Sequence, residues 1–331
     1  DGSPAASGPG IAHGAELWSG AIATSIGGGG SFSISGNSLM YPLMGYGAYG
    51  VNPSGGFGGA GARTAHVFNS SWGAGDNTGN SVLNVLYDYL ANEHGASMVV
   101  ASGNAGQGAG SVYSPANGWN VIAVGATDGL DDPESVAWFS SGGSVGSFNL
   151  SDTRVKPDLV APGQSLVMPS TSGPTGYTTA SGTSFAAPVT AAAAALLVDL
   201  GLDTGRSTDP RLVKSVMMNS ATKLEGFSRE VGVHPVDATV INSTPVDDAQ
   251  GAGRLDLVNA WRQYTASEGP SGEPAGTVGT RGWSVGQVGQ ADPADFTIDS
   301  RLYAGETLTA TLAWFMDRSV VGYDIHAAAP F

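Results

Sequence analysis

The stretch "TAHVFNSSWG" (residues 64–73), followed by "NSVLNVLYDYLANEHG" (80–95) and "ASMVVASGN" (96–104), decides the fold class of this chain. The first and third segments are short, apolar and rich in β-branched residues, which is typical of strands buried on both faces. The middle segment repeats its apolar residues at helical spacing. A helix between two buried strands indicates a parallel crossover, so the pattern predicts an α/β fold.

The same alternation continues along the chain. "WNVIAVGAT" (119–127) is a further predicted strand, and residues 182–201 and 209–224 are predicted helices. The second helix opens with Asp209 as a candidate cap and Pro210 at its first position, where a missing N–H costs nothing. We therefore expect a parallel sheet flanked by helices.

Composition excludes several classes of protein. The chain has 331 residues, of which 41% are hydrophobic, enough for one large core and a smaller second unit. Acidic residues outnumber basic ones 28 to 13, so nucleic acid is not an expected partner. No apolar run reaches the roughly 18 uncharged residues that a membrane span needs. We therefore expect a soluble chain. The absence of cysteine leaves the redox compartment undecided, and the absence of an initiator methionine and an apolar leader suggests a processed or incomplete N-terminus.

The composition and the pattern of apolar residues change near residue 265. "SEGPSGEPAG" (267–276) is a polar stretch, and the segments after it alternate apolar and polar residues, as antiparallel strands with one wet face do. The sequence predicts three parts: an α/β domain over 1–264, a linker over 265–276, and over 277–331 the start of an antiparallel β-sandwich or jelly-roll domain.

A serine lies where a turn meets a helix, in "SGTSFAAP" (181–188). A catalytic serine needs exposure, a tight turn and a helix N-terminus, and Ser184 has the sequence context for all three. Gly182 permits unusual dihedral angles, and small Ala186 and Ala187 let the helix pack closely. Pro188 is tolerated if it falls in the first turn. The alternative is that Ser184 only caps a buried helix.

The string "SGTSFAAP" resembles the nucleophile signature of the subtilisin-like serine proteases, the subtilases. "VVASGNAG" (99–106) is similar to the family segment that carries the oxyanion asparagine, which falls here on Asn104. The resemblance implies that the Asn104 side chain and the Ser184 N–H together face the developing oxyanion. Further strings match the family in order: 68–73, 120–127, 139–141, 155–163, 212–222 and 251–261.

The resemblance also requires a base, and the order of motifs favours His13 in "GIAHGAELWSGAIAT" (10–24), where a glycine and a small-residue helix are expected to follow. The segment departs from the family at Ala15, where threonine is usual, and at Glu16. A related family uses glutamate as the base, which draws attention to Glu16, but its serine motif lacks "FAAP". The alternative for His13 is a helix-capping or solvent-exposed loop histidine. The family's aspartate is expected upstream of residue 1.

The resemblance implies that two segments flank an extended substrate in antiparallel pairing, with Trp72 as an apolar wall near the cleaved bond. The predicted substrate-binding residues are Ser71, Trp72, Gly73, Ala101, Ser102 and Gly103.

Two regions are left open by the sequence. Residues 24–62 are glycine-rich with aromatic residues, and are either a rearranged surface loop or a specificity loop over the cleft. "DGLDDPES" (128–135) clusters acidic side chains that could bind calcium, but it lacks the spacing of a calcium loop and could equally be a solvated turn. The chemistry itself is expected to need no cofactor, and structural calcium is implied only by the resemblance.

The expected function is that of a secreted serine endopeptidase acting on proteins or peptides, with secretion and substrates implied by the resemblance. The alternatives are a catalytically inactive binding protein of the same fold and a cell-surface protein whose function is carried by the C-terminal β-domain. The sequence leaves the oligomeric state unknown.

Overall fold

A computed structural model of the chain contains a parallel sheet in the order β3-β4-β5-β8. Its strands are β3 (Val67–Ser70), β4 (Ser97–Ala101), β5 (Ile122–Thr127) and β8 (Leu159–Pro162). Every residue of β4 and β5 is buried, which explains their continuous apolar sequence. The structure describes residues 10–26, 32–108, 110–128, 135–145, 154–170, 173, 176–228, 231–233, 240–242, 246–268, 276–287, 295–298, 301, 303–304, 308–321 and 324–327.

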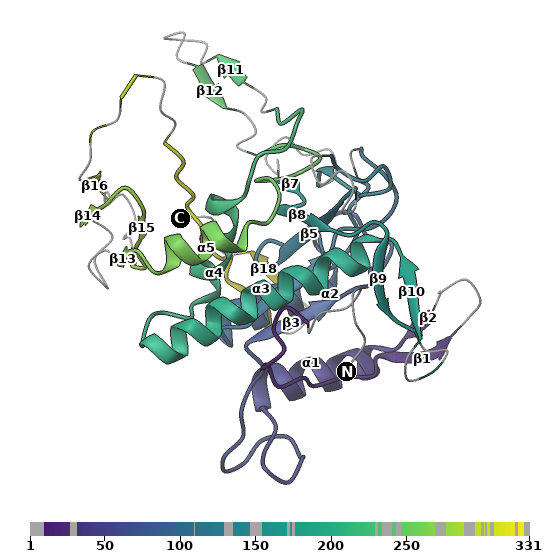
Figure 1. Cartoon of the computed structure of the whole chain (residues 1–331). Helices are drawn as coiled ribbons and strands as arrows, with labels where there is room; N and C mark the ends of the chain where they lie inside the picture. The colour runs from purple at the N-terminus through teal and green to yellow at the C-terminus, as the bar shows by residue number, and fades with distance from the viewer. Residues whose placement is uncertain are drawn as a thin grey trace.

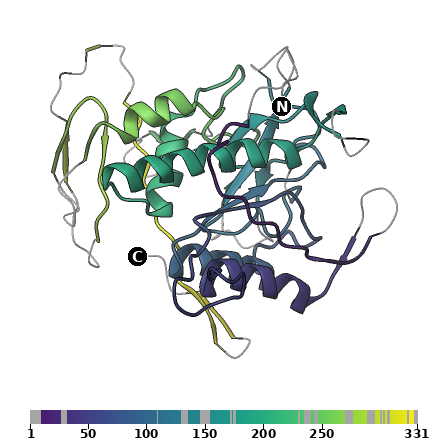
Figure 2. The ribbon, with the colours of Figure 1, turned by 60° about the horizontal axis from the view of Figure 1, so that its bottom comes forward.

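Helices cover both faces of the sheet. On one face lie α3 (Thr183–Thr204), α4 (Pro210–Ser220) and α5 (Leu257–Tyr264), and on the other lie α1 (Gly36–Met44) and α2 (Val82–Glu93) (Figures 1 and 2). Side chains alternate between two buried clusters: Val99 and Ala101 of β4 face α3, while Met98 and Val100 face α2. The predicted α/β fold is confirmed.

The two predicted C-terminal helices of this unit are present. The Asp209 side chain accepts a hydrogen bond from the N–H of Arg211, and Pro210 is the first residue of α4, as predicted. Contrary to the expectation from the sequence, helix α3 is by length and composition long and apolar enough to cross a membrane. Its residues Ala186, Ala187 and Ala194 are instead buried against the sheet, so we assign α3 to the protein core.

The N-terminal region differs from the prediction. No helix follows His13: residues 11–15 form a turn and Leu17 is 91% exposed. Gly14 and Gly20 disfavour a helix in so short a stretch. The glycine-rich region instead contains the hairpin β1 (Ala23–Ile26) and β2 (Phe32–Ile34), then α1 and a π-helical turn, Gly45–Tyr49.

Helix α1 forms inside a region that the sequence left open. Ser35 caps it reciprocally with Ser38, and Leu39 and Leu43, four residues apart, are both buried. Because this helix belongs to the core, residues 35–44 are not a surface loop. The high glycine content of residues 24–62 drew attention away from the helical spacing of Leu39 and Leu43 in the sequence.

The C-terminal stretch also differs from the prediction. Strand β13 (Ser267–Glu268) pairs in parallel with β15 (Gly282–Trp283), and β14 (Gly276–Val278) in parallel with β16 (Phe296–Ile298). The predicted antiparallel pairing is therefore wrong for these strands. Residues 308–316 form no strand, since their backbone finds no ladder partner within the described ranges.

Part of the C-terminal stretch packs against the helices that flank the parallel sheet. The Trp283 ring stacks on Tyr264 with centroids 5.8 Å apart, and its Nε1 donates to the Tyr264 carbonyl. Strands β17 (Arg318–Val321) and β18 (Asp324–Ala327) form an antiparallel hairpin, with β17 beside α2 (Figure 2). The three-part division of the chain stays a prediction.

The other short antiparallel pairs are β6 (Gly143–Ser144) with β7 (Val155–Lys156), β9 (Leu166–Pro169) with β10 (Tyr177–Ala180), and β11 (Val231–Val233) with β12 (Val240–Asn242).

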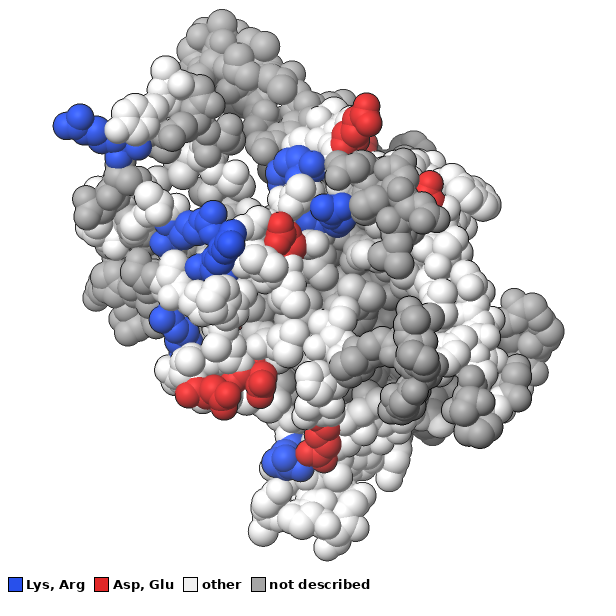
Figure 3. Space-filling model, in the orientation of Figure 1, with Lys and Arg blue, Asp and Glu red and all other residues white. Residues whose placement is uncertain are grey.

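Charges are sparse on the described surface in the view of Figure 3. Several charged side chains are buried, and three of them form one cluster. Asp158 of the "VKPDLVAPG" segment lies 2.7 Å from Lys156 Nζ and 3.1 Å from Lys214 Nζ, and both lysines also donate to the Val121 carbonyl. Burial lowers the pKa of Lys156 to about 8. Burial would raise the pKa of Asp158, but the two lysines hold it below its ordinary value. The cluster joins α4 to β8.

Candidate active site

The site lies at the N-terminus of α3. Gly182 precedes the helix with φ of 153°, a conformation that favours glycine, and it offers no side chain to cap the helix. Asn104, in the loop after β4, caps the helix instead, because its Oδ1 accepts hydrogen bonds of 2.9 Å from both the N–H and the hydroxyl of Thr183. The N–H of Gly103 in turn donates to the Thr183 hydroxyl at 3.2 Å.

These contacts orient the Asn104 amide. With its oxygen turned to Thr183, its Nδ2 lies 3.4 Å from the position that a Cβ on Gly182 would occupy, and the side chain is exposed. Ser184 is the second residue of α3, so its N–H is one of the four without an acceptor inside the helix. The Ser184 N–H and the Asn104 amide are therefore the candidate donors at this helix end.

Ser184 is tied to the end of β3 by reciprocal hydrogen bonds. The Ser71 Oγ donates to the Ser184 carbonyl at 2.7 Å, and the Ser184 Oγ donates to the Ser71 carbonyl at 3.3 Å. The first bond has a cause in the sequence. Pro188, sixth in α3 and so beyond the first turn where the sequence interpretation placed it, has no N–H for the carbonyl four residues earlier. Ser71 supplies the missing donor.

The predicted substrate-binding residues follow two neighbouring parallel strands. Ser70 of β3 is paired with Val100 of β4, so the residues after each strand leave the same edge of the sheet. Gly73 is exposed and Trp72 half-buried, its ring 6.3 Å from that of Tyr87. Ser71, Ala101 and Gly103 are half-buried or buried at this edge, while the Ser102 side chain points inward and donates to the Ser141 carbonyl.

A second loop holds the Asn104 segment from the other side. The Ser141 Oγ accepts from the N–H of Ala105 at 3.0 Å, and the Ser141 N–H donates to the Gly103 carbonyl at 3.0 Å. The Phe139 carbonyl accepts from the N–H of Gly106 at 2.9 Å. The "FSS" string therefore fixes the backbone on both sides of Asn104.

The structure does not join His13 to this assembly. His13 is exposed in the turn at 11–15, and within the described part of the chain it makes no hydrogen bond to Ser184. Its neighbour Glu16 accepts from Trp18 Nε1 at 2.8 Å and pairs with Arg63 at 2.7 Å, contacts that lower the pKa of Glu16. A lowered pKa opposes a role for Glu16 as a general base.

The candidate calcium turn falls largely outside the described residues, which include only Asp128 and Ser135 of it; Gln164 donates to the Asp128 carboxylate. Across the described ranges, no group of three or more histidine or acidic residues could hold a metal ion.

The sequence interpretation missed Thr183 and the bonding role of Ser71. Thr183 joins the N-terminus of α3 to the loop after β4, since it donates to Asn104 and accepts from Gly103. Its position inside "SGTS" was the available signal. For Ser71 the signal was Pro188, whose place in a helix demands an outside donor.

Comparison with known proteins gives concordant matches. The model of the Subtilase family matches residues 6–253. The chain is 35% identical to "Subtilisin-like protease SBT6.1" of Arabidopsis thaliana over 50% of its own length, and 31% identical to "Membrane-bound transcription factor site-1 protease" of Mus musculus over 59%. A solved structure, that of the prenylagaramide maturation protease PagA, matches with a TM-score of 0.52 and 26% identity over 73% of this chain and 72% of that one. The chain spans only 14% and 16% of the two curated relatives.

Proposed function

Because this chain belongs to the subtilase family, we propose that it is a serine endopeptidase in which Ser184 is the nucleophile. The observation that supports the proposal is the helix end itself: Asn104 caps α3 through Thr183, the residue before Ser184, and the Ser184 N–H has no acceptor inside the helix. A nucleophile and two donors aimed at one place are what acyl transfer requires.

In the proposed reaction, the Ser184 Oγ attacks the carbonyl carbon of the substrate peptide bond and gives its proton to the His13 imidazole. His13 must first move to Ser184 from the exposed turn where the structure places it. The negative oxygen is stabilised by the Ser184 N–H and the Asn104 amide. The imidazolium then protonates the leaving amine, and an acyl-enzyme remains, which water hydrolyses by the same steps in reverse order. The Ser184 hydroxyl must first leave the Ser71 carbonyl to reach the base.

We further propose that substrates are proteins or peptides that bind in extended form along the residues after β3 and β4, with Trp72 as an apolar wall. The proteases named among the relatives support this substrate class. Secretion and structural calcium are proposals of the same kind, implied by the resemblance, and the chemistry proposed for these residues requires no cofactor.

The test is labelling of the whole chain with a fluorophosphonate, with Ser184→Ala as the control. We expect the reagent to attach to Ser184 alone, and expect cleavage of a peptide library by the unlabelled protein only. If the chain folds but neither labels nor cleaves, the inactive binding protein is the correct interpretation and our proposal is wrong.

A further inference from the structure

A short C-terminal segment, residues 316–321, is fastened to α2 by a buried ion pair. We refer to it as the strap. Arg318 Nη1 lies 3.0 Å from the Asp88 carboxylate, with side chains 1% and 0% exposed. The same guanidinium donates to the Gly79 carbonyl at 3.0 Å and to Asn80 Oδ1 at 3.2 Å. Arg318 thus joins the strap to both α2 and the loop before it.

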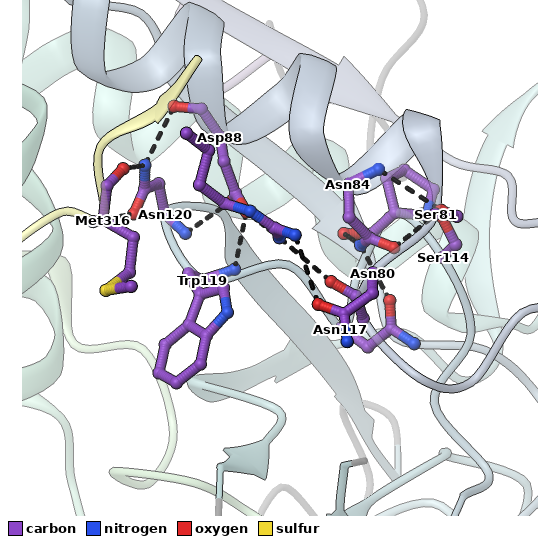
Figure 4. Close-up of polar contacts among 12 residues, drawn as sticks. Asn80, Ser81, Asn84, Asp88, Ser114, Asn117, Trp119, Asn120 and Met316 are labelled. Carbon is purple, nitrogen blue, oxygen red and sulfur yellow. Dashed lines mark hydrogen bonds and ion pairs between the residues drawn. The ribbon is translucent and has the colours of Figure 1, made fainter. Parts of the chain in front are cut away.

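The strap is also held through its backbone. Asn120 donates from Nδ2 to the Met316 carbonyl at 2.8 Å, and its Oδ1 accepts from the Met316 N–H at 2.7 Å (Figure 4). The Asn120 Nδ2 donates to the Asp88 carbonyl as well. One asparagine side chain therefore bonds the strap and α2 together.

Asp88 depends on this arrangement. Its carboxylate accepts from the N–H groups of Asn120 at 2.8 Å and Trp119 at 3.3 Å, but Arg318 is its one cationic partner within the described residues. A fully buried carboxylate without a counter-charge is strongly unfavourable. The strap therefore determines whether this part of α2 can remain buried.

Next to Asp88 on α2 is Tyr87, which faces the substrate-binding edge. Its hydroxyl lies 2.7 Å from the Ser70 Oγ, and its ring meets the Trp72 ring edge-on. Tyr87 is 1% exposed, and burial raises its pKa, so the hydroxyl keeps its proton at neutral pH. Ser71, between these two contacts, is the residue that exchanges hydrogen bonds with Ser184.

We propose that Tyr87 is a positioning residue for the edge Ser70–Trp72, and that the strap, through Arg318, holds α2 where Tyr87 can do so. The inference rests on the proposed function, because the edge matters only if it binds substrate. It makes the strap, whose Arg318 is 230 residues from Asp88 in the sequence, a determinant of substrate affinity.

Tyr87→Phe is the primary test, since it keeps the ring against Trp72 and removes only the hydroxyl. For peptides with four residues before the cleaved bond, we expect KM to rise about five-fold with kcat little changed, the equivalent of one neutral hydrogen bond. The rate of fluorophosphonate labelling should stay at the wild-type value, because that small reagent does not use the edge.

Arg318→Met tests the strap, with Arg281→Met, an exposed arginine in the same stretch, as the matched control. We expect Arg318→Met to raise KM at least as much as Tyr87→Phe, the double variant to cost less than the product of the two, and Arg281→Met to change nothing. Arg318→Lys should recover part of the affinity.

The outcomes separate the two proposals. Wild-type KM in Tyr87→Phe, with labelling intact, overturns the inference while leaving the nucleophile assignment standing. If Arg318→Met does not fold, Arg318→Lys decides the strap's part, and a wild-type KM there counts against it. Absence of labelling in the parent protein is a failure of the proposed function instead.

Discussion

The hydroxyls of Ser71 and Ser184 each donate to the other residue's backbone carbonyl, at 2.7 Å and 3.3 Å. The shorter bond replaces the helical N–H that Pro188 cannot supply. The end of β3 and the start of α3 are therefore fixed to each other by the same residues that are proposed to bind and to attack the substrate.

Ser71→Ala should remove the side-chain donor of the Ser184 carbonyl. We expect the free energy of unfolding to fall by about 1 kcal/mol, the usual effect of one lost hydrogen bond. Pro188→Ala restores a helical N–H, so in that background Ser71→Ala should cost clearly less. Urea unfolding of the four inhibitor-blocked proteins measures this, and additive effects would contradict it.

Asn104 has two functions that substitution can separate. Asn104→Asp keeps an acceptor for Thr183 at the positive end of α3, so stability should hold, while the loss of the amide donor should lower kcat about a hundred-fold or more, a magnitude taken from a subtilisin. Asn104→Ala should lose both the acceptor for Thr183 and the amide donor. Its free energy of unfolding should fall by about 1 kcal/mol, as for a lost helix cap. Equal unfolding energies for the two variants would refute the capping role.

Ser184→Ala and His13→Ala should each remove nearly all activity, and the double variant should lose little more, because a nucleophile without its base is already disabled. Both positions are at least partly exposed, so stability should change by less than about 1 kcal/mol. Single-turnover kinetics on the whole chain is the measurement. Should His13→Ala keep most of the parent rate, another residue is the base.

The pKa of Lys156, lowered by burial to about 8 from 10.5, predicts a dependence of stability on pH. Between these values the unfolded chain binds more protons than the folded one, so the contribution of Lys156 to the free energy of unfolding rises with pH, by at most about 1.4 kcal/mol per unit. Lys156→Met leaves Asp158 paired with Lys214 and should lack this rise. Urea unfolding from pH 8 to 10, in a Ser184→Ala background to prevent self-digestion, should show the curves diverging; parallel curves would count against a depressed pKa.

Sequence and structure agree where the signal is local. Strands β4 and β5, the crossover helix α2 and the Asp209 cap of α4 could all be predicted, because β-branched runs, helical periodicity and a cap before proline act within a few residues. The helix expected after His13 is absent: the order of motifs suggested it, but Gly14 and Gly20 disfavour a helix in so short a stretch.

The sequence by itself determined the parallel α/β fold and the identity of the candidate nucleophile, since both are written in contiguous segments. Only the tertiary structure decided which groups serve them: Ser71 for the Ser184 carbonyl, 113 residues away, and Arg318 for Asp88, 230 residues away. Such partners depend on how packed elements bring distant side chains within hydrogen-bond distance, and no local pattern encodes that geometry. The orientation of the Asn104 amide also depends on packing: its oxygen accepts a hydrogen bond from Thr183, and its nitrogen lies near Gly182.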